Sequence, residues 1–231
     1  RPHPSIALGM MMVAACPGGN VSNFMSKLAG GNLALSITLT TISTFASLIM
    51  TPFSFAFYGN LYPPTAEILK RISLDPMEVS KLVLLILGIP LFLGTLLQYF
   101  KPVFASRFSK IMKPVSVIIF LTFIIGAFLN NLDVFLNHVH HVFFLVLLHN
   151  GLLFATGFIL AKTAGLNLLD QKTISIETGI QNSGLGLMLV FAFFGGLGGM
   201  AILVAFWAIW DMVSALLLGF LFSFFKGKLS K

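Results

Sequence analysis

Charged side chains are scarce in this sequence. Asp, Glu, Lys and Arg make up only 9% of its 231 residues, whereas 57% are hydrophobic and the mean hydropathy is +0.98. A soluble domain carries about 25% charged residues, so water could not solvate the surface of this chain. The composition therefore excludes an ordinary soluble domain and predicts a membrane protein.

The sequence also lacks alternating segments of about ten residues, which would indicate a membrane β-barrel. Its apolar runs are about 20 residues long and predict an all-α, polytopic helical bundle surrounded by membrane lipid. Cysteine is nearly absent, and the single Cys16 excludes an internal disulfide. The net charge is +7, but the basic residues are scattered among loops and the tail. We therefore expect no nucleic-acid partner.

The hydrophobic runs predict seven membrane crossings. The first and the sixth runs are interrupted by polar residues and glycine. The third begins at an N-terminal helix pattern, with Asp75 as the N-cap, Pro76 as the first helical residue and Glu78 three residues after the cap, and Pro90 is expected to kink it. The predicted crossings are residues 6–28, 33–58, 76–100, 115–136, 142–166, 174–194 and 200–225.

The basic residues predict the orientation of the chain. One side carries ten of them, namely Lys27, Lys101, Arg107, Lys110, Lys113, Lys162, Lys172, Lys226, Lys228 and Lys231. By the positive-inside rule this side and the C-terminus face the cytoplasm, in a cell inner (plasma) membrane. Seven crossings then place Arg1 outside. An external amino end without Met or a signal peptide predicts that an odd number of further spans precedes this segment.

The two interruptions read ACPGGNVSN (residues 15–23) and ETGIQNSG (residues 177–184). Unwound backbone is tolerated in hydrocarbon only where protein or a water-filled cavity satisfies its polar groups. The broken segments are five crossings apart, so they run in opposite directions, and each precedes an unbroken span. This pattern is typical of an inverted-repeat secondary transporter, whose paired interrupted helices bind substrate and ion. A five-span repeat predicts ten spans, three of them upstream.

Oxygen-bearing side chains gather around these interruptions. Ser36 and Thr40 are four residues apart and share a helix face, while Ser22 and Asn23 follow the first interruption. Together with Glu177 they offer hydroxyl, amide and carboxylate oxygens, which are the ligands of hard cations. One negative charge suits a monovalent ion, since the occupied site is then neutral. We expect sodium, but a proton on Glu177 would neutralise the charge as well.

A second sodium site is expected around the same carboxylate. Gln181 lies four residues after Glu177 and shares its helix face. The interruption frees the backbone carbonyls of Thr178 and Ile180. These oxygens together make a second site around Glu177 chemically reasonable.

Three polar residues lie inside later spans. His149 and Asn150 belong to the fifth span and are expected to face a substrate cleft. Asp211 lies in the middle of the last span, where an acid is either functional or hydrogen-bonded to a neighbouring helix. Residues 195–199 (GGLGG) lack the flanking strand and the Lys of a phosphate-binding loop, and they predict a tight turn instead.

Two long motifs carry a family resemblance. They are CPGGNVSNFMSKLAGGNLALSITLTTIST (residues 16–44) and ETGIQNSGLGLML (residues 177–189). With them the chain resembles the bile acid:sodium symporter family over essentially its whole length, as the last seven of ten helices. The resemblance implies a core domain, in which two discontinuous helices cross beside two sodium ions, and a panel domain. It also implies that an organic anion binds in the cleft between them.

The resemblance further implies which residues bind the ions and the substrate. The first sodium site would comprise Ser22, Asn23, Ser36, Thr40 and Glu177. The second would comprise Glu177, Thr178, Ile180 and Gln181, with a Gln from an earlier helix. The substrate cleft would be lined by Pro17, Gly18, Gly19, Asn20 and Asn182. Residues 1–58 and 139–231, the cytoplasmic tail included, would form the core, and residues 76–137 the panel.

We therefore predict a sodium-coupled symporter of a small organic anion, bile-acid-like or otherwise carboxylated or sulfonated, and not an enzyme. Half-helix N-termini would attract the anion, and the domains would rock to alternate access. One alternative is a proton-coupled antiporter or arsenite-type permease on a related ten-helix fold. Another is a non-transporting membrane protein that lacks the first three helices.

Overall fold

The computed structural model describes residues 2–72, 76–130 and 132–229. Its regular structure is helical throughout, as the sequence predicts. The elements are α1 (Pro4–Ala15), α2 (Val21–Leu28), α3 (Leu33–Leu61), α4 (Pro63–Ile72), α5 (Pro76–Val83), the π-helical turn η1 (Leu84–Gly88), α6 (Ile89–Phe100), α7 (Pro102–Asn130), α8 (Leu132–Thr163), α9 (Leu168–Gly179), α10 (Ser183–Phe194) and α11 (Gly198–Leu229).

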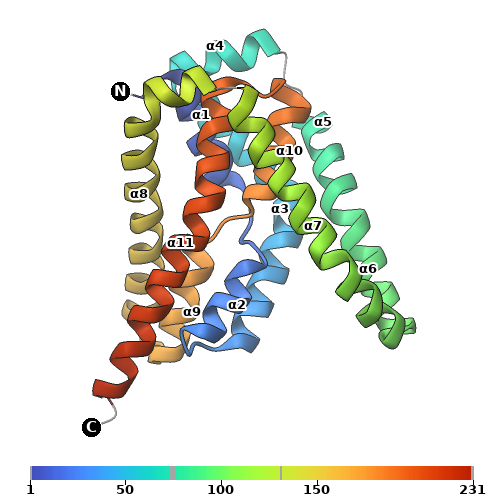
Figure 1. Cartoon of the computed structure of the whole chain (residues 1–231), viewed down its shortest axis with the longest axis vertical. Helices are drawn as coiled ribbons and strands as arrows, with labels where there is room; N and C mark the ends of the chain where they lie inside the picture. The colour runs from blue at the N-terminus through green and yellow to red at the C-terminus, as the bar shows by residue number, and fades with distance from the viewer. Residues whose placement is uncertain (1, 73–75, 131, 230–231) are drawn as a thin grey trace.

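The long helix α11 forms the centre of the bundle. It packs against α1, α8 and α10 (Figure 1), and its residues from Met200 to Ala205 are fully buried. The short helices α1 and α10 are apolar around most of their circumference, which is typical of helices enclosed by others. In Figure 1, α6 and the lower part of α7 diverge from this core on the right.

Four described stretches are long and apolar enough to cross a membrane. They are Leu33–Leu61, Met77–Phe100, Val142–Thr163 and Gly198–Phe222. Large apolar side chains such as Ile49 and Phe92 are exposed on these helices, where hydrocarbon would contact them. The chain is therefore a multi-pass membrane protein, while the full set of seven crossings stays a prediction.

Asparagine residues are the N-caps of three helices that contribute to the site. Asn32 Oδ1 accepts a hydrogen bond from the backbone N–H of Leu35 at the start of α3, and Asn182 Oδ1 does the same for Leu185 in α10, both at 3.1 Å. Asn167 caps α9 in the same way. Each cap satisfies a backbone donor that has no partner inside its helix.

The glycine turn between the last two helices is confirmed. Gly195 ends α10 in the left-handed conformation with φ of 55°, and Gly196 follows with φ of 72°. Residues with a Cβ rarely adopt these angles, and glycine adopts them without steric cost. The turn reverses the chain so that α11 can run back through the core.

Some predicted helix ends are wrong. The fourth helix begins at Pro102 rather than near residue 115, and it ends at Asn130 rather than near residue 136. The fifth begins at Leu132 rather than at residue 142. Hydropathy marks apolar runs only: it does not show where a helix continues beyond a run, as at Pro102 and Leu132, or where a helix ends within one, as at Asn130. The amphipathic helix α4 was not expected either.

Near Pro90, where a kink is predicted, the structure shows a change of helix type, and the kink itself stays a prediction. The π-helical turn η1 ends two residues before Pro90. Proline has no backbone N–H and interrupts the helical ladder, and π-helical turns occur at such interruptions. The predicted N-cap residue Asp75 lies outside the described residues.

The contact between α1 and α11 depends on Gly9. A Cβ at this position would lie 3.1 Å from Leu203 Cβ and 3.2 Å from Met200 Cα. We expect Gly9→Leu to destabilise the protein by about 1–3 kcal/mol through overpacking, which lowers the melting temperature by roughly 2–12 °C. Gly94→Leu is the control, because no atom lies within 4 Å of a Cβ there. Equal melting temperatures of the two purified variants would contradict this packing.

Candidate functional site

The two interruptions of the broken helices lie against each other. Residues 16–20 separate α1 from α2, and residues 180–182 separate α9 from α10; we call these two segments together the crossover. Gly18 pairs with Gln181 in an antiparallel bridge. The Gly19 N–H donates to Ile180 O at 3.2 Å, and the Asn182 N–H donates to Pro17 O at 2.8 Å. Each segment thus satisfies backbone groups of the other, as hydrocarbon requires.

The two consecutive glycines of the first interruption make this approach possible. A Cβ on Gly19 would lie 3.0 Å from Gln181 O, and a Cβ on Gly18 would lie 3.3 Å from Glu177 Oε2. Both distances are tighter than ordinary van der Waals contacts of a Cβ. The glycines therefore allow one backbone to lie directly on the other and on the carboxylate.

Glu177 is the centre of the polar site. Its Oε1 accepts hydrogen bonds from Ser36 Oγ and, at 2.6 Å, from Ser22 Oγ. Its Oε2 accepts from Thr40 Oγ1 at 2.9 Å. Asn23 Oδ1 lies 2.9 Å from Ser36 Oγ and 3.3 Å from Thr40 Oγ1. The structure thus brings all five predicted residues together, and we call them the Glu177 cluster.

Three elements supply the Glu177 cluster. Ser22 and Asn23 come from the first turn of α2, Ser36 and Thr40 from one face of α3, and Glu177 from the end of α9. The three hydroxyl-bearing residues are at most 4% exposed. The cluster offers hydroxyl, amide and carboxylate oxygens with one formal negative charge. This donor set fits a hard monovalent cation, which would leave the buried site neutral.

The residues of the second predicted ion site lie at the crossover, but their oxygens are engaged differently. Gln181 Nε2 donates to Thr178 O at 3.0 Å, and Ile180 O accepts the N–H of Gly19. The hydrogen bonds of the Glu177 carboxylate go to Ser22, Ser36 and Thr40 instead. Each carbonyl keeps a second lone pair, so the second site stays a prediction.

A cavity of about 290 Å³ opens beside the crossover, and we call it the crossover pocket. Its lining includes three predicted substrate residues, Gly19, Asn20 and Asn182. Gln181 and Asp211 line it as well. Pro17 and Gly18 contribute instead to the backbone contact described above and do not line the cavity.

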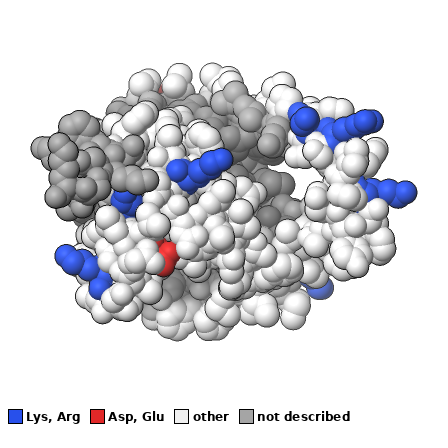
Figure 2. Space-filling model, turned by 90° about the horizontal axis from the view of Figure 1, so that it is seen from below, with Lys and Arg blue, Asp and Glu red and all other residues white. Residues whose placement is uncertain are grey.

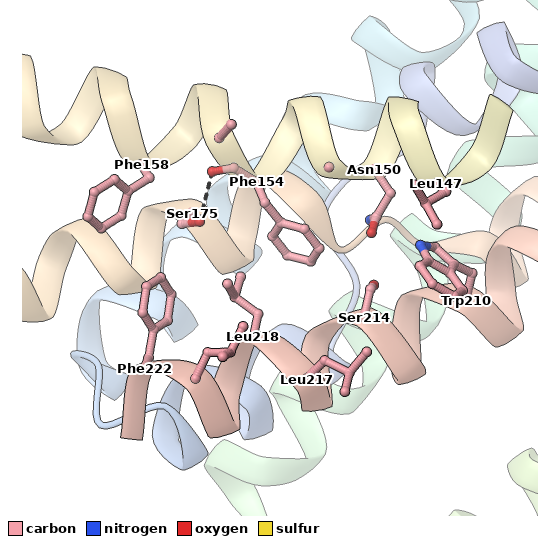
Figure 3. Close-up of a pocket in the computed structure, with 13 residues that line it drawn as sticks. Leu147, Asn150, Phe154, Phe158, Ser175, Trp210, Ser214, Leu217, Leu218 and Phe222 are labelled. Atoms are coloured by element: carbon pink, nitrogen blue, oxygen red, sulfur yellow. Dashed lines mark hydrogen bonds between the residues drawn. The ribbon is translucent and has the colours of Figure 1, made fainter. Parts of the chain in front are cut away.

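Neither His149 nor Asn150 lines the crossover pocket, although Asn150 contacts its lining residue Asp211. His149 lines a different cavity of about 1170 Å³ beside α1 and α3, and its ring meets that of Trp207 edge-on at 4.9 Å. Asn150 is buried on the other side of α8, where it lines a groove between α8 and α11 opposite Trp210 and Ser214 (Figure 3).

Asp211 is hydrogen-bonded to the neighbouring helix α8, which is one of the two predicted readings, and it also contacts the crossover, which was not predicted. It is 4% exposed, and its Oδ2 lies 3.2 Å from the Gln181 backbone nitrogen and 3.4 Å from Ser183 Oγ. Its Oδ1 accepts from Asn150 Nδ2 at 3.2 Å. The sequence signal was only an acid in the middle of an apolar span.

Lys172 is also placed differently from the prediction. The sequence assigned it to a loop, but it lies within α9 and is 3% exposed. Its Nζ donates to Ala29 O at 3.3 Å and to Phe222 O at 3.1 Å. These carbonyls lie near the end of α2 and in α11, so the ammonium group ties the lower ends of both helices to α9.

Comparisons with known proteins show the family of this chain. Residues 1–138 match the sequence pattern of the Sodium Bile acid symporter family. The chain is 32% identical over 213 residues to the "Uncharacterized sodium-dependent transporter YocS" of Bacillus subtilis, covering 92% of this chain and 63% of that protein. It is 34% identical over 198 residues to the "Probable sodium/metabolite cotransporter BASS1, chloroplastic" of Arabidopsis thaliana, covering 83% and 46%.

A third relative is the "Sodium-dependent organic anion transporter" of the mouse, 31% identical over 183 residues, which cover 78% of this chain and 46% of the relative. The chain thus spans between about half and two thirds of the length of these three relatives. The family is one of transporters and not of enzymes. Since the match to this family covers more than half of the 231 residues, the chain belongs to the sodium bile acid symporter family.

Proposed function

We propose that this protein takes part in sodium-coupled symport of a small organic anion. The observation that carries the proposal is the Glu177 cluster, in which one carboxylate and four neutral oxygen-bearing side chains from three helices converge. The names of the relatives support it, since they describe sodium-dependent transport, cotransport of a metabolite and transport of an organic anion.

The first sodium ion would be held by the Glu177 cluster. When bound, the ion supplies a positive charge that neutralises the Glu177 carboxylate. Ser22, Ser36 and Thr40 can direct their hydroxyl hydrogens to the carboxylate and their lone pairs to the ion. Because these residues come from α2, α3 and α9, binding would favour the arrangement in which the three helices meet.

The second sodium ion would be held around the same carboxylate. Its proposed ligands are Glu177, Gln181 and the backbone carbonyls of Thr178 and Ile180. The two carbonyls are free of their own helix because α9 ends at Gly179. The set is completed, by the family resemblance, by a Gln of an earlier helix.

The anion would bind at the crossover pocket. The helices α2 and α10 begin there, and helix N-termini favour negative charge. Asn182 Oδ1 already accepts from the Leu185 N–H, so its Nδ2 is the group that can donate to an anion. Asn20 and Gly19 line the same pocket. Pro17 and Gly18 hold the backbone of Gln181 and Asn182, which also line it. His149 and Asn150 lie outside this pocket, so the proposal for the anion does not include them.

The fold supports alternating access on an inverted repeat. The broken segment α1–α2 is followed by the unbroken α3, and the broken segment α9–α10 by the unbroken α11. In a ten-helix protein these would be corresponding units of opposite direction. Residues 1–58 and 139–231 would form the core domain, and residues 76–137 the panel that moves relative to it.

The distribution of charge supports a cytoplasmic C-terminus in a plasma membrane. The lower end of the molecule, where the C-terminus lies, carries Lys and Arg side chains with little acidic surface (Figures 1 and 2). An excess of Lys and Arg marks the cytoplasmic side of a membrane protein. The helices α2, α6 and α11 end on this side, and α9 begins there (Figure 1).

The role of Glu177 can be tested without knowing the anion. We expect Glu177→Gln to lower the apparent sodium affinity by about three orders of magnitude, because two unit charges 4 Å apart attract each other by about 4 kcal/mol at an effective dielectric constant of 20. The measurement is the rise in melting temperature of the purified protein as sodium is added. Glu67→Gln, at an exposed acid of α4, is the control. A normal sodium response in Glu177→Gln would contradict the assignment.

Replacing the cation separates sodium coupling from proton coupling. In proteoliposomes at fixed pH, we expect uptake of a transported anion to fall at least about tenfold when external sodium is replaced by potassium, since the larger ion fits the compact Glu177 cluster less well. The anion is first chosen from a panel of bile acids, other carboxylates and sulfonates by its additional, sodium-dependent stabilisation of the protein. Undiminished uptake in potassium would contradict the sodium assignment and favour protons.

The position of the anion can be tested at Asn182. Asn182→Asp keeps an oxygen that caps α10 but adds a negative charge to the crossover pocket. We expect it to weaken binding of the selected anion at least about tenfold by repulsion, without weakening the sodium response. Asn182→Ser, which also keeps a capping oxygen and adds no charge, should lose less. Equal anion affinity in Asn182→Asp and the unmodified protein would place the anion elsewhere.

A further inference from the structure

Two buried polar residues on long helices hold the backbone where α9 passes into the second interruption. Asn150 of α8 donates from Nδ2 to Gly179 O at 2.9 Å and to Asp211 Oδ1 at 3.2 Å. Asp211 of α11 accepts the Gln181 N–H with its other oxygen, at 3.2 Å. Asn150 is 1% exposed and Asp211 4%. We call this chain of contacts, from Gly179 through both side chains to Gln181, the Asn150–Asp211 bridge.

The bridge satisfies backbone groups that the helices themselves cannot satisfy. Gly179 is the last residue of α9, so no N–H of that helix donates to its carbonyl oxygen. The Gln181 N–H lies between α9 and α10 and likewise has no partner inside a helix. A buried backbone group without a partner costs about 1–3 kcal/mol. One residue, Ile180, lies between the two held groups, so the bridge fixes the peptide planes on both sides of it.

The packing of α8 on α9 adds to this restraint. Phe154 lies one turn after Asn150, and a Cβ on Gly179 would run into its ring. The Phe154 carbonyl accepts a hydrogen bond from Ser175 Oγ at 2.8 Å. Figure 3 shows Asn150 and Phe154 on the same side of α8, facing the groove toward α11, with Ser175 of α9 bonded beside them. The end of α9 thus packs against the Phe154 ring of α8 and is hydrogen-bonded to the Asn150 amide of the same helix.

We propose that Asn150 and Asp211 are positioning residues for sodium binding. The inference rests on the proposed function, because it concerns the ion sites around Glu177. Glu177 lies two residues before Gly179, and Ile180 and Gln181 are proposed ligands of the second ion. The Asn150–Asp211 bridge sets the direction of the Ile180 carbonyl and the place of Gln181. Neither bridge residue belongs to the Glu177 cluster or to the proposed second ligand set.

The bridge requires that both terminal atoms of the side chain at position 211 accept hydrogen bonds. Asn150 Nδ2 donates to one oxygen of Asp211, while the Gln181 N–H and Ser183 Oγ face the other. In Asp211→Asn the side chain keeps its shape, but one of its oxygens becomes an NH₂ group. Whichever way the new amide turns, it sets a donor against Asn150 Nδ2 or against the Gln181 N–H. The substitution therefore breaks the bridge with no change in volume.

The test measures the sodium concentration that gives half of the maximal thermal stabilisation of the purified protein. We expect Asp211→Asn to raise this concentration at least about fivefold, as the loss of one buried hydrogen bond implies. Asp133→Asn, the same chemical change at an exposed site, should leave it unchanged. If Asp211→Asn lowers the melting temperature equally at every sodium concentration, the half-maximal concentration is unchanged, the residue is only structural and the inference is overturned.

A second variant keeps the test decisive if Asp211→Asn does not fold. Asn150→Ser removes the donor to Gly179 O and should raise the half-maximal sodium concentration in the same direction. The double variant should be less than additive, because both changes break one bridge. Full additivity, or an unchanged half-point in Asn150→Ser, overturns the inference. If the unmodified protein itself shows no sodium response, the proposed function fails instead, so the two failures are distinguishable.

Discussion

The structure depends on a single carboxylate placed between three helices. An acid in the interior of a membrane protein costs at least about 2.5 kcal/mol on insertion scales, and Glu177 is surrounded by neutral hydroxyl groups of α2 and α3. Those groups can reach it only if α2, α3 and the end of α9 meet at one point. The requirement to stabilise one charge thus dictates how two broken segments and an unbroken helix pack.

The backbone at the crossover obeys the same constraint. Each interruption exposes N–H and C=O groups that hydrocarbon cannot solvate, and each uses the other as its partner, as in the bridge between Gly18 and Gln181. What remains is satisfied from outside, by Asn150 and Asp211 at the second interruption and by Thr51, whose hydroxyl donates to Ala15 O at 2.6 Å, at the first. Helix breaks at this depth are therefore stable only as a pair, enclosed by long helices.

The five residues predicted for the first ion site do converge in the structure, whereas the residues that support them were not predicted together. The members of the Glu177 cluster could be found because they are polar residues at helical spacing beside two interruptions. The partners of Asp211 could not be predicted, because they come from α8 and from the segment after α9, and only the tertiary packing brings these next to α11. Lys172 was assigned to a loop for a related reason: hydropathy treats a lysine as exposed, although carbonyls of two neighbouring helices can hold it.

A cation beside Glu177 is the central claim of this account, and a high-resolution density map tests it most directly. Maps of the purified protein in saturating sodium and in a sodium-free buffer of equal ionic strength are compared at the Glu177 cluster. The account predicts a compact peak enclosed by the carboxylate, hydroxyl and amide oxygens that is present only in sodium. Identical maps, with the carboxylate held by hydroxyl groups alone in both, would contradict it.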